Sequence, residues 1–335
     1  MNFEFIQPQK IIFGQGSITR VGEESKELGA RRVLIVTSRG MLKRESLKEV
    51  TASLKDYQLN FEIFSNVAPE PPIENVYDCI SLAKKNEYNL IIGLGGGSVL
   101  DVAKKAAADL GLPKIMAPTT AGTGSEVTHE SVLKVDGKKK AFVEKSLVPN
   151  VALVDPDLTK TATLPLAASS GIDALAHAVE CYESRKSNLL VKTLALKASK
   201  LLRENIQKAM AGNDEARINM SLGSLIAGMA FGNSGTTLGH ALSYPLSNRG
   251  IPHGAAVAIV LPYAMEFNNA EADFISKIKE ITMLIEPRWG NEWNVEDMVK
   301  EVMKDEKHLA NNPRQVTYEG VLRIFEQIRS WLTER

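Results

Sequence analysis

The chain contains 335 residues, of which 40 are basic and 40 are acidic, and this balance excludes a strongly basic nucleic-acid-binding surface as its defining feature. Its length exceeds what one hydrophobic core usually supports, so we expect two domains. The sequence shows no secretory leader, no apolar run of about 18 residues and, with Cys79 and Cys181 far apart, no disulfide framework. We therefore expect a cytoplasmic protein without a membrane or nucleic-acid partner.

Short β-branched runs alternate with helical patterns through the first half of the chain. This alternation is typical of a parallel sheet covered by helices. The Asp136-Gly137 pair is the turn signal of a β-hairpin. The expected sheet strands are 10–14, 32–37, 61–64, 90–94, 114–118 and 151–156, the hairpin strands are 132–135 and 141–143, and the expected helices are 18–28, 46–54 and 73–85.

A glycine-rich turn follows the apolar strand at 90–94. The run Gly95-Gly96-Gly97-Ser98 leads into a helix start, where bare backbone N–H groups and the helix N-terminus can bind phosphate. The spacing matches neither G-x-G-x-x-G nor the P-loop. By its chemistry this turn suits a pyrophosphate, and the alternative interpretation is a tight turn that only packs the helix on the sheet.

The strand at 114–118 ends in a second polar segment. The run Thr119-Thr120-Ala121-Gly122-Thr123-Gly124-Ser125-Glu126 is rich in small hydroxyl side chains. Such side chains at a strand end suit polar contacts to a sugar or a base edge, although Ser/Thr/Gly runs are often simple loops.

From Ala167 onward the apolar residues recur with helical spacing and form no convincing strand pattern. We therefore predict an α/β domain over residues 1–160 and an all-α domain over residues 161–335. The expected helices of the second domain are 189–207, 214–231, 255–267, 270–285, 295–304 and 317–332.

The second domain carries a set of potential metal ligands. Asp173 and His177 are spaced i, i+4, so on a helix capped by Ser169 or Ser170 they would share one face. His240 and His253 lie in two further segments. One carboxylate and three imidazoles suit Fe(II), Zn(II) or another first-row divalent ion and argue against calcium. The alternative interpretation is a local Asp–His pair and two ordinary histidines.

Four motifs together resemble the iron-containing (group III) alcohol dehydrogenase family, from about residue 8 to about residue 265. They are Gly95-Gly96-Gly97-Ser98-x-x-Asp101-x-Ala103-Lys104, Pro118-Thr119-Thr120-Ala121-Gly122-Thr123-Gly124-Ser125-Glu126, Gly171-x-Asp173-Ala174-x-x-His177-Ala178-x-Glu180 and Pro252-His253-Gly254. The resemblance implies an N-terminal Rossmann-like domain followed by a helical domain, an architecture similar to that of dehydroquinate synthase. It also implies a nicotinamide-dependent enzyme that interconverts a small alcohol and an aldehyde or ketone, with a divalent metal polarising the substrate oxygen.

The same resemblance implies roles for individual residues. A cofactor-facing lysine of the family best fits Lys139, with Lys138 and Lys140 as competitors. Asp173, His177, His240 and His253 correspond to the metal ligands; Gly95, Gly96, Gly97, Ser98 and Asp101 correspond to the pyrophosphate motif; and Thr119, Thr120 and Thr123 correspond to positions that contact the cofactor.

Two departures from the family pattern concern proton delivery and the pocket wall. Many members have a further histidine four residues after the third ligand, where this chain has Tyr244, and the interval from there to His253 looks one residue short. Tyr244 could donate a proton through its hydroxyl, or it could shape the pocket while water relays the proton. The C-terminal helical region is also shorter than in typical members.

Cofactor and substrate preferences are open to further argument from single residues. After the strand at 32–37 the chain has Ser38 and Arg39 instead of an acidic residue, which favours NADP(H) over NAD(H). Arg249 could indicate a phosphonoacetaldehyde reductase-like specificity, and a glycerol dehydrogenase-like specificity is a further alternative. A dehydroquinate synthase-like lyase is disfavoured, because that class uses a Glu-His-His metal set. The resemblance also suggests a homodimer.

Overall fold

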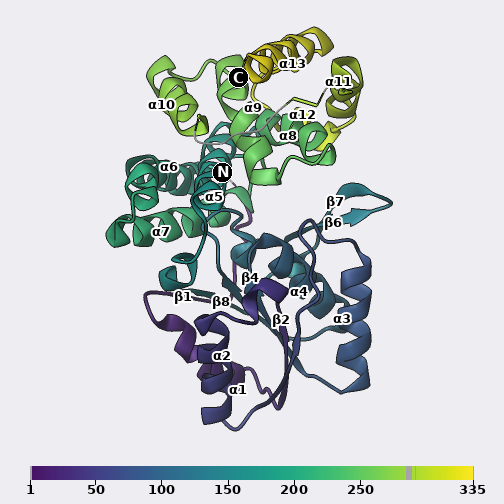
Figure 1. The fold of residues 1–335 in the computed structure, drawn as a ribbon, viewed down its shortest axis with the longest axis vertical. Helices are drawn as coiled ribbons and strands as arrows, with labels where there is room; N and C mark the ends of the chain where they lie inside the picture. Colours follow the sequence, from purple (N-terminus) through teal and green to yellow (C-terminus); the bar gives the residue numbers. More distant parts are fainter. Residues whose placement is uncertain (1, 284–288, 291, 335) are drawn as a thin grey trace.

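The computed structural model describes residues 2–283, 289–290 and 292–334. Figure 1 shows a parallel sheet flanked by helices, formed by the first half of the chain, and a separate group of helices formed by the second half. The predicted fold class is confirmed. Within the described ranges no helix is long and apolar enough to cross a membrane.

The sheet contains six parallel strands in the order β1-β8-β5-β4-β2-β3. From β2 the chain first builds β3 at the sheet edge and then returns to place β4 on the other side of β2. The connections therefore diverge between the carboxyl ends of β2 and β4, and such a switch point is where open α/β sheets bind ligands. The strands are β1 (Lys10–Phe13), β2 (Arg32–Val36), β3 (Asn60–Phe64), β4 (Leu90–Gly95), β5 (Lys114–Pro118) and β8 (Val151–Val154).

Helices cover both faces of this sheet, which explains why its central strands are almost uniformly apolar. Successive strand residues point to opposite faces. Ile35 belongs to the apolar cluster that includes Val50 of α2, whereas its neighbour Leu34 belongs to the cluster that includes Leu100 of α4. The α-helices of this half are α1 (Val21–Glu27), α2 (Glu45–Asp56), α3 (Glu74–Lys85) and α4 (Gly97–Leu110), and the 3-10 helices are η1 (Ser17–Arg20), η2 (Arg39–Met41), η3 (Ser125–Val127), η4 (Lys145–Leu147) and η5 (Pro156–Thr159).

The predicted hairpin is present as β6 (Glu130–Val135) and β7 (Lys138–Val143). Its turn residues Asp136 and Gly137 have φ values of 50° and 76°, the left-handed conformations that a two-residue hairpin turn requires. Figure 1 shows the hairpin at the level between the sheet and the helical group, and Lys139 of β7 hydrogen-bonds Ser247 of α8 (Leu238–Asn248).

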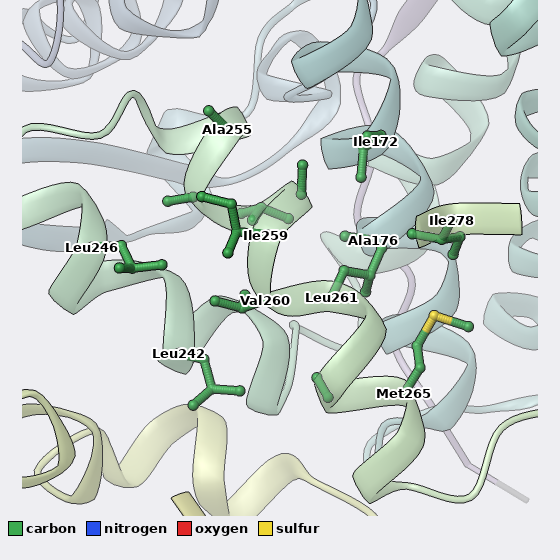
Figure 2. Packing of buried hydrophobic residues seen from close by; sticks show 14 of the residues in the cluster. Ile172, Ala176, Leu242, Leu246, Ala255, Ile259, Val260, Leu261, Met265 and Ile278 are labelled. Atoms are coloured by element: carbon green, nitrogen blue, oxygen red, sulfur yellow. The ribbon is translucent and has the colours of Figure 1, made fainter. Parts of the chain in front are cut away.

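In the second half, α9 is buried by the helices around it. Residues 255–262 of α9 are all buried, as expected for a helix that is apolar on every side. Figure 2 shows Ile259 and Val260 of this helix among side chains of α5, α8 and α10. The helices are α5 (Leu164–Glu183), α6 (Leu189–Met210), α7 (Asp214–Phe231), α8 (Leu238–Asn248), α9 (His253–Phe267), α10 (Ala272–Thr282), α11 (Val295–Met303), α12 (Glu306–Asn311) and α13 (Tyr318–Thr333).

The start of α5 differs from the prediction. The helix begins at Leu164 after the N-cap Thr163, so Ser169 and Ser170 lie inside it and the predicted serine cap is wrong. Pro165 favours the earlier start, because the first helical turn leaves amide hydrogens unbonded and proline lacks one.

Two short helices were not expected from the sequence. The structure forms α8 at 238–248 and α12 at 306–311. Gly239 and Pro245 lower the helix propensity of α8, and it forms because its apolar residues pack into the core around α9. Of the helix predicted at 270–285, residues 284 and 285 lie outside the described residues.

Candidate functional site

Three helices of the second domain bring the predicted metal ligands together. The Oδ1 atom of Asp173 on α5 lies 4.0 Å from Nε2 of His177, 3.8 Å from Nε2 of His240 at the start of α8, and 4.0 Å from Nε2 of His253 at the start of α9. Asp173, His240 and His253 have ligand atoms within 4.8 Å of one another. One carboxylate oxygen therefore faces three imidazole nitrogens.

Neighbouring groups orient two of these imidazoles. Nδ1 of His240 lies 2.5 Å from Oε2 of Glu180, and Nδ1 of His177 lies 3.2 Å from the carbonyl oxygen of Gly122. A proton on each Nδ1 can donate to these acceptors, which turns both Nε2 atoms toward Asp173. The His177 ring also stacks on Phe231, with centroids 4.0 Å apart.

Glu180 is a well-bonded buried carboxylate. Its Oε1 accepts hydrogen bonds from the backbone N–H and the hydroxyl of Thr237 and from the backbone N–H of His240. Burial alone would raise its pKa, but the charge and hydrogen bonds of His240 and the two backbone amides outweigh it, and the pKa falls to about 2. Glu180 is therefore ionised and stabilises His240 as an Nδ1–H donor.

These residues fit a divalent cation. Oδ1 of Asp173 is buried and has no hydrogen-bond partner within the described residues, and such a group is costly unless something else neutralises it. The Nε2 atoms of His177 and His240 are only 3.1 Å apart, so either a proton or a cation must lie between their lone pairs. The His253 side chain is 30% exposed, so the cluster opens to solvent on that side.

The glycine-rich turn, residues 95–98, lies at the carboxyl end of β4. It borders the crevice between the carboxyl ends of β2 and β4. Gly96 caps α4 without a side-chain hydrogen bond, which leaves the first amides of that helix available to an anion. A Cβ atom on Gly97 would lie 2.7 Å from the side chain of Thr123. The turn therefore needs glycine for its close approach to residues 119–126, the threonine loop.

The threonine loop, residues 119–126, follows β5 and packs against the helical domain. The Thr119 amide donates to the carbonyl of Gly95 at 3.0 Å, which places the loop beside the glycine-rich turn. Gly124 has φ +58°, and a Cβ there would lie 2.5 Å from Cα of Gly228 on α7. Thr119, Thr120 and Thr123 thus all lie beside the glycine-rich turn.

Lys139 is the lysine of the hairpin that points toward the helical domain. Its Nζ contacts Oε1 of Glu70 at 3.0 Å and Oγ of Ser247 on α8 at 2.6 Å. By contrast, Lys138 and Lys140 are exposed. Glu70, which the sequence analysis missed, also places its backbone amide 3.2 Å from Oγ of Ser98. No pattern around Glu70 in the sequence indicated this contact.

The remaining predicted cofactor residues have mixed surroundings. Ser38 and Arg39 follow β2 at the crevice, where the exposed Arg39 donates to Oδ1 of Asn66 at 2.8 Å. Asp101 instead accepts hydrogen bonds from the hydroxyl of Ser125 and the amide of Val132. We therefore interpret Asp101 as support for the loop and the hairpin.

Tyr244 lies beside the ligand cluster, next to a histidine that the sequence analysis missed. The Tyr244 ring stacks near His253, with centroids 6.0 Å apart, and meets the ring of His308 edge-on at 5.6 Å. Burial strongly raises the pKa of the Tyr244 hydroxyl, so this hydroxyl is a weak acid. His308 follows its N-cap Asp305 by three positions, a spacing that reads in the sequence only as a helix cap.

Arg249 has a local partner. Its guanidinium lies 2.7 Å from Oε1 of Glu301 and donates to the carbonyl of Pro245. Glu301 therefore neutralises the positive charge of Arg249 that had suggested an anionic substrate.

Comparison with known proteins agrees with this geometry. The profile of iron-containing alcohol dehydrogenase matches residues 8–156, and that of the Fe-containing alcohol dehydrogenase family, C-terminal, matches residues 167–302. The chain is 39% identical over 278 residues to long-chain-alcohol dehydrogenase 1 of Geobacillus thermodenitrificans, covering 76% of this chain and 70% of that protein.

Solved structures are similar over nearly the whole chain. A 1,3-propanediol oxidoreductase superposes with a TM-score of 0.92 at 28% identity, covering 98% of this chain and 100% of that one. Sulfoacetaldehyde reductase from Bifidobacterium kashiwanohense in complex with NAD+ superposes with a TM-score of 0.89 at 29% identity, covering 98% and 99%. The chain therefore belongs to the iron-containing alcohol dehydrogenase family and is an alcohol dehydrogenase/aldehyde reductase of that family.

Proposed function

We propose that Asp173, His177, His240 and His253 hold one divalent metal ion, with Fe(II) as the expected ion and Zn(II) as an alternative, and that the enzyme reduces small aldehydes with NADPH. The observation that carries this proposal is the buried Oδ1 of Asp173, which has three imidazole nitrogens within 4.0 Å. When bound, the metal supplies Lewis-acid polarisation of the substrate oxygen, and the nicotinamide supplies or accepts the hydride.

The protein's own contribution is to orient and to exclude water. Glu180 and the Gly122 carbonyl fix the imidazoles of His240 and His177 in the ligand orientation. Asp173, His177 and His240 are at most 5% exposed, and charges interact more strongly where water is excluded. The opening beside His253 and Tyr244 gives the substrate a path to the cluster.

The cofactor is proposed to lie along the crevice at the carboxyl ends of β2 and β4. Its diphosphate would meet the free amides at the start of α4, in Gly97 and Ser98, and Lys139 supplies a cation on the side of the helical domain. Arg39, beside Ser38, would pair with the 2′-phosphate of NADP(H). A related enzyme was solved with NAD+, so this preference depends on the residues at the end of β2.

The experiment is a comparison of protein stripped by a chelator with the same protein reloaded with Fe(II) or Zn(II). Oxidation of NADPH and NADH is followed with a panel of small aldehydes. The proposal predicts metal-dependent turnover with NADPH preferred. Equal turnover in stripped protein would contradict the metal assignment, and a preference for NADH would contradict the role of Arg39. We further expect a homodimer, which light scattering in solution tests.

A further inference from the structure

We propose that His308, held in place by Asp305, determines substrate specificity by hydrogen-bonding a hydroxyl on the carbon atom one or two positions beyond the reacting carbon. The inference rests on the proposed function, because it assumes that the reacting oxygen binds beside the four ligand candidates, Asp173, His177, His240 and His253. The substrate class would then be a small diol or hydroxyaldehyde.

Asp305 fixes the imidazole of His308. Nδ1 of His308 lies 2.7 Å from both carboxylate oxygens of Asp305, and Asp305 also accepts the backbone N–H of His308 as the N-cap of α12. A carboxylate in this position makes Nδ1 the protonated nitrogen. Within the described residues no protein group hydrogen-bonds Nε2 of His308, so this nitrogen remains for a ligand.

His308 stands next to the open side of the ligand cluster. Its ring is nearly parallel to that of His240, with centroids 6.4 Å apart, and meets Tyr244 edge-on. Tyr244 in turn stacks beside His253, the ligand whose side chain is 30% exposed. Tyr244 therefore contacts both His308, which is 6% exposed, and the ligand candidate on the side that opens to solvent.

His308 lies beside the metal-ligand candidates and not among them. Its ring centroid is 6.4 Å from that of His240, and it does not belong to the set of Asp173, His240 and His253 whose ligand atoms lie within 4.8 Å of one another. Two further carbon atoms extend a substrate by about 2.5 Å from its reacting carbon. In the proposed binding mode, a hydroxyl on such a carbon accounts for the nitrogen of His308 that no protein group bonds.

The surrounding charges favour a neutral hydroxyl over an anionic group. Asp305 contacts His308 directly, whereas the nearby carboxylate of Glu130 is paired with Lys307 at 2.9 Å. An anionic substrate end would be repelled by Asp305. A hydroxyl both donates and accepts, so it can bond Nε2 whether that nitrogen carries a proton or a lone pair.

The test compares kcat/KM for 3-hydroxypropanal and propanal in metal-loaded wild type, His308→Leu and His308→Asn. The inference predicts that the wild type prefers the hydroxylated aldehyde by at least about tenfold, that His308→Leu removes most of this preference, mainly through KM, and that His308→Asn restores part of it. Glu306→Gln, an exposed neighbour on the same helix, is the matched control and should keep the wild-type ratio.

A binding measurement complements the kinetics. Propane-1,3-diol should raise the thermal unfolding midpoint of metal-loaded wild type and of Glu306→Gln, but not of His308→Leu. An unchanged aldehyde ratio in His308→Leu, or equal protection of both proteins by the diol, would overturn the inference. If neither aldehyde is turned over, the proposed function fails, and the dependence of diol protection on His308 still decides this inference.

Discussion

Two carboxylates three positions apart on α5 show how the surroundings of a residue decide its role. Glu180 is bonded to His240 and to two backbone amides, and its pKa falls to about 2. Burial raises the pKa of Glu183 to about 7, and its hydrogen bond is to Asn268. Only the first carboxylate touches a metal-ligand candidate.

Replacing Glu180 tests this difference. In Glu180→Gln the charge that holds the Nδ1 proton of His240 is lost, so we expect metal affinity to fall by about 10- to 100-fold. Competition with a chelator measures this affinity. Glu183→Gln on the same helix is the control and should bind metal as the wild type does; equal affinities in all three proteins would contradict the role of Glu180.

The buried carboxyl group of Glu126 should make the free energy of unfolding depend on pH. Burial raises the pKa of Glu126 to about 7 from an ordinary value of 4.5. The folded protein therefore holds this proton more tightly than the unfolded chain, and the resulting stability is full below pH 4.5 and is lost as pH rises through about 7. Glu126→Gln removes this loss.

The free energy of unfolding, measured with urea at pH 5 and pH 8, checks the sign. Between pH 5 and pH 8, the free energy of unfolding of Glu126→Gln should rise by up to about 3 kcal/mol relative to that of wild type. The exposed Glu204→Gln should show no such gain. Glu183 titrates in the same pH range, so the pH dependence of the variant is compared with that of the wild type. An identical pH dependence of the unfolding free energy in both proteins would contradict the prediction.

At the scale of elements, the threonine loop packs against α7 and so holds the sheet domain against the helical domain. Gly124 combines φ +58° with backbone of Gly228 only 2.5 Å from its ideal Cβ position, whereas Gly137 has φ +76° and nothing within 4 Å. An alanine at position 137 would therefore introduce backbone strain alone, whereas an alanine at position 124 would also clash with α7.

Alanine substitutions at both positions use this contrast. Gly137→Ala should cost about 1–2 kcal/mol, the penalty of a left-handed conformation with a side chain. Gly124→Ala should cost at least about 3 kcal/mol, since overpacking adds to the strain, and should also weaken cofactor binding. Urea unfolding measures the costs, and similar values for the two variants would contradict the packing account.

The sequence predicted some elements and not others for physical reasons. The apolar strands and the Asp136-Gly137 turn are local signals, and the structure has them. The helix α8 was missed because Gly239 and Pro245 oppose a helix that only tertiary burial stabilises. His308 was missed because its contacts join segments far apart in the chain, and no spacing in the sequence reports them.

At the scale of the whole molecule, the site depends on two domains meeting. The order of the strands, which creates the crevice between β2 and β4, could not be read from the sequence. The four ligand candidates could, because they lie in short motifs. Lys139 of the sheet domain reaches Ser247 of the helical domain, so one cation joins the two halves beside the crevice.

Removing this cation should weaken cofactor binding. We expect Lys139→Met to raise the Kd for NADPH by about tenfold, the value of a charge-assisted hydrogen bond. Lys138→Met, an exposed neighbour on the same strand, should leave Kd unchanged. Fluorescence titration of NADPH measures binding without turnover, and equal effects of the two variants would contradict the assignment.

The most direct test of the central claim is an anomalous scattering map of crystals soaked in Fe(II) or Zn(II). The account predicts one strong peak per chain, within bonding distance of Oδ1 of Asp173 and of Nε2 of His177, His240 and His253, and no such peak in Asp173→Ala crystals. A peak elsewhere, or none at these four atoms in metal-loaded active crystals, would contradict the account.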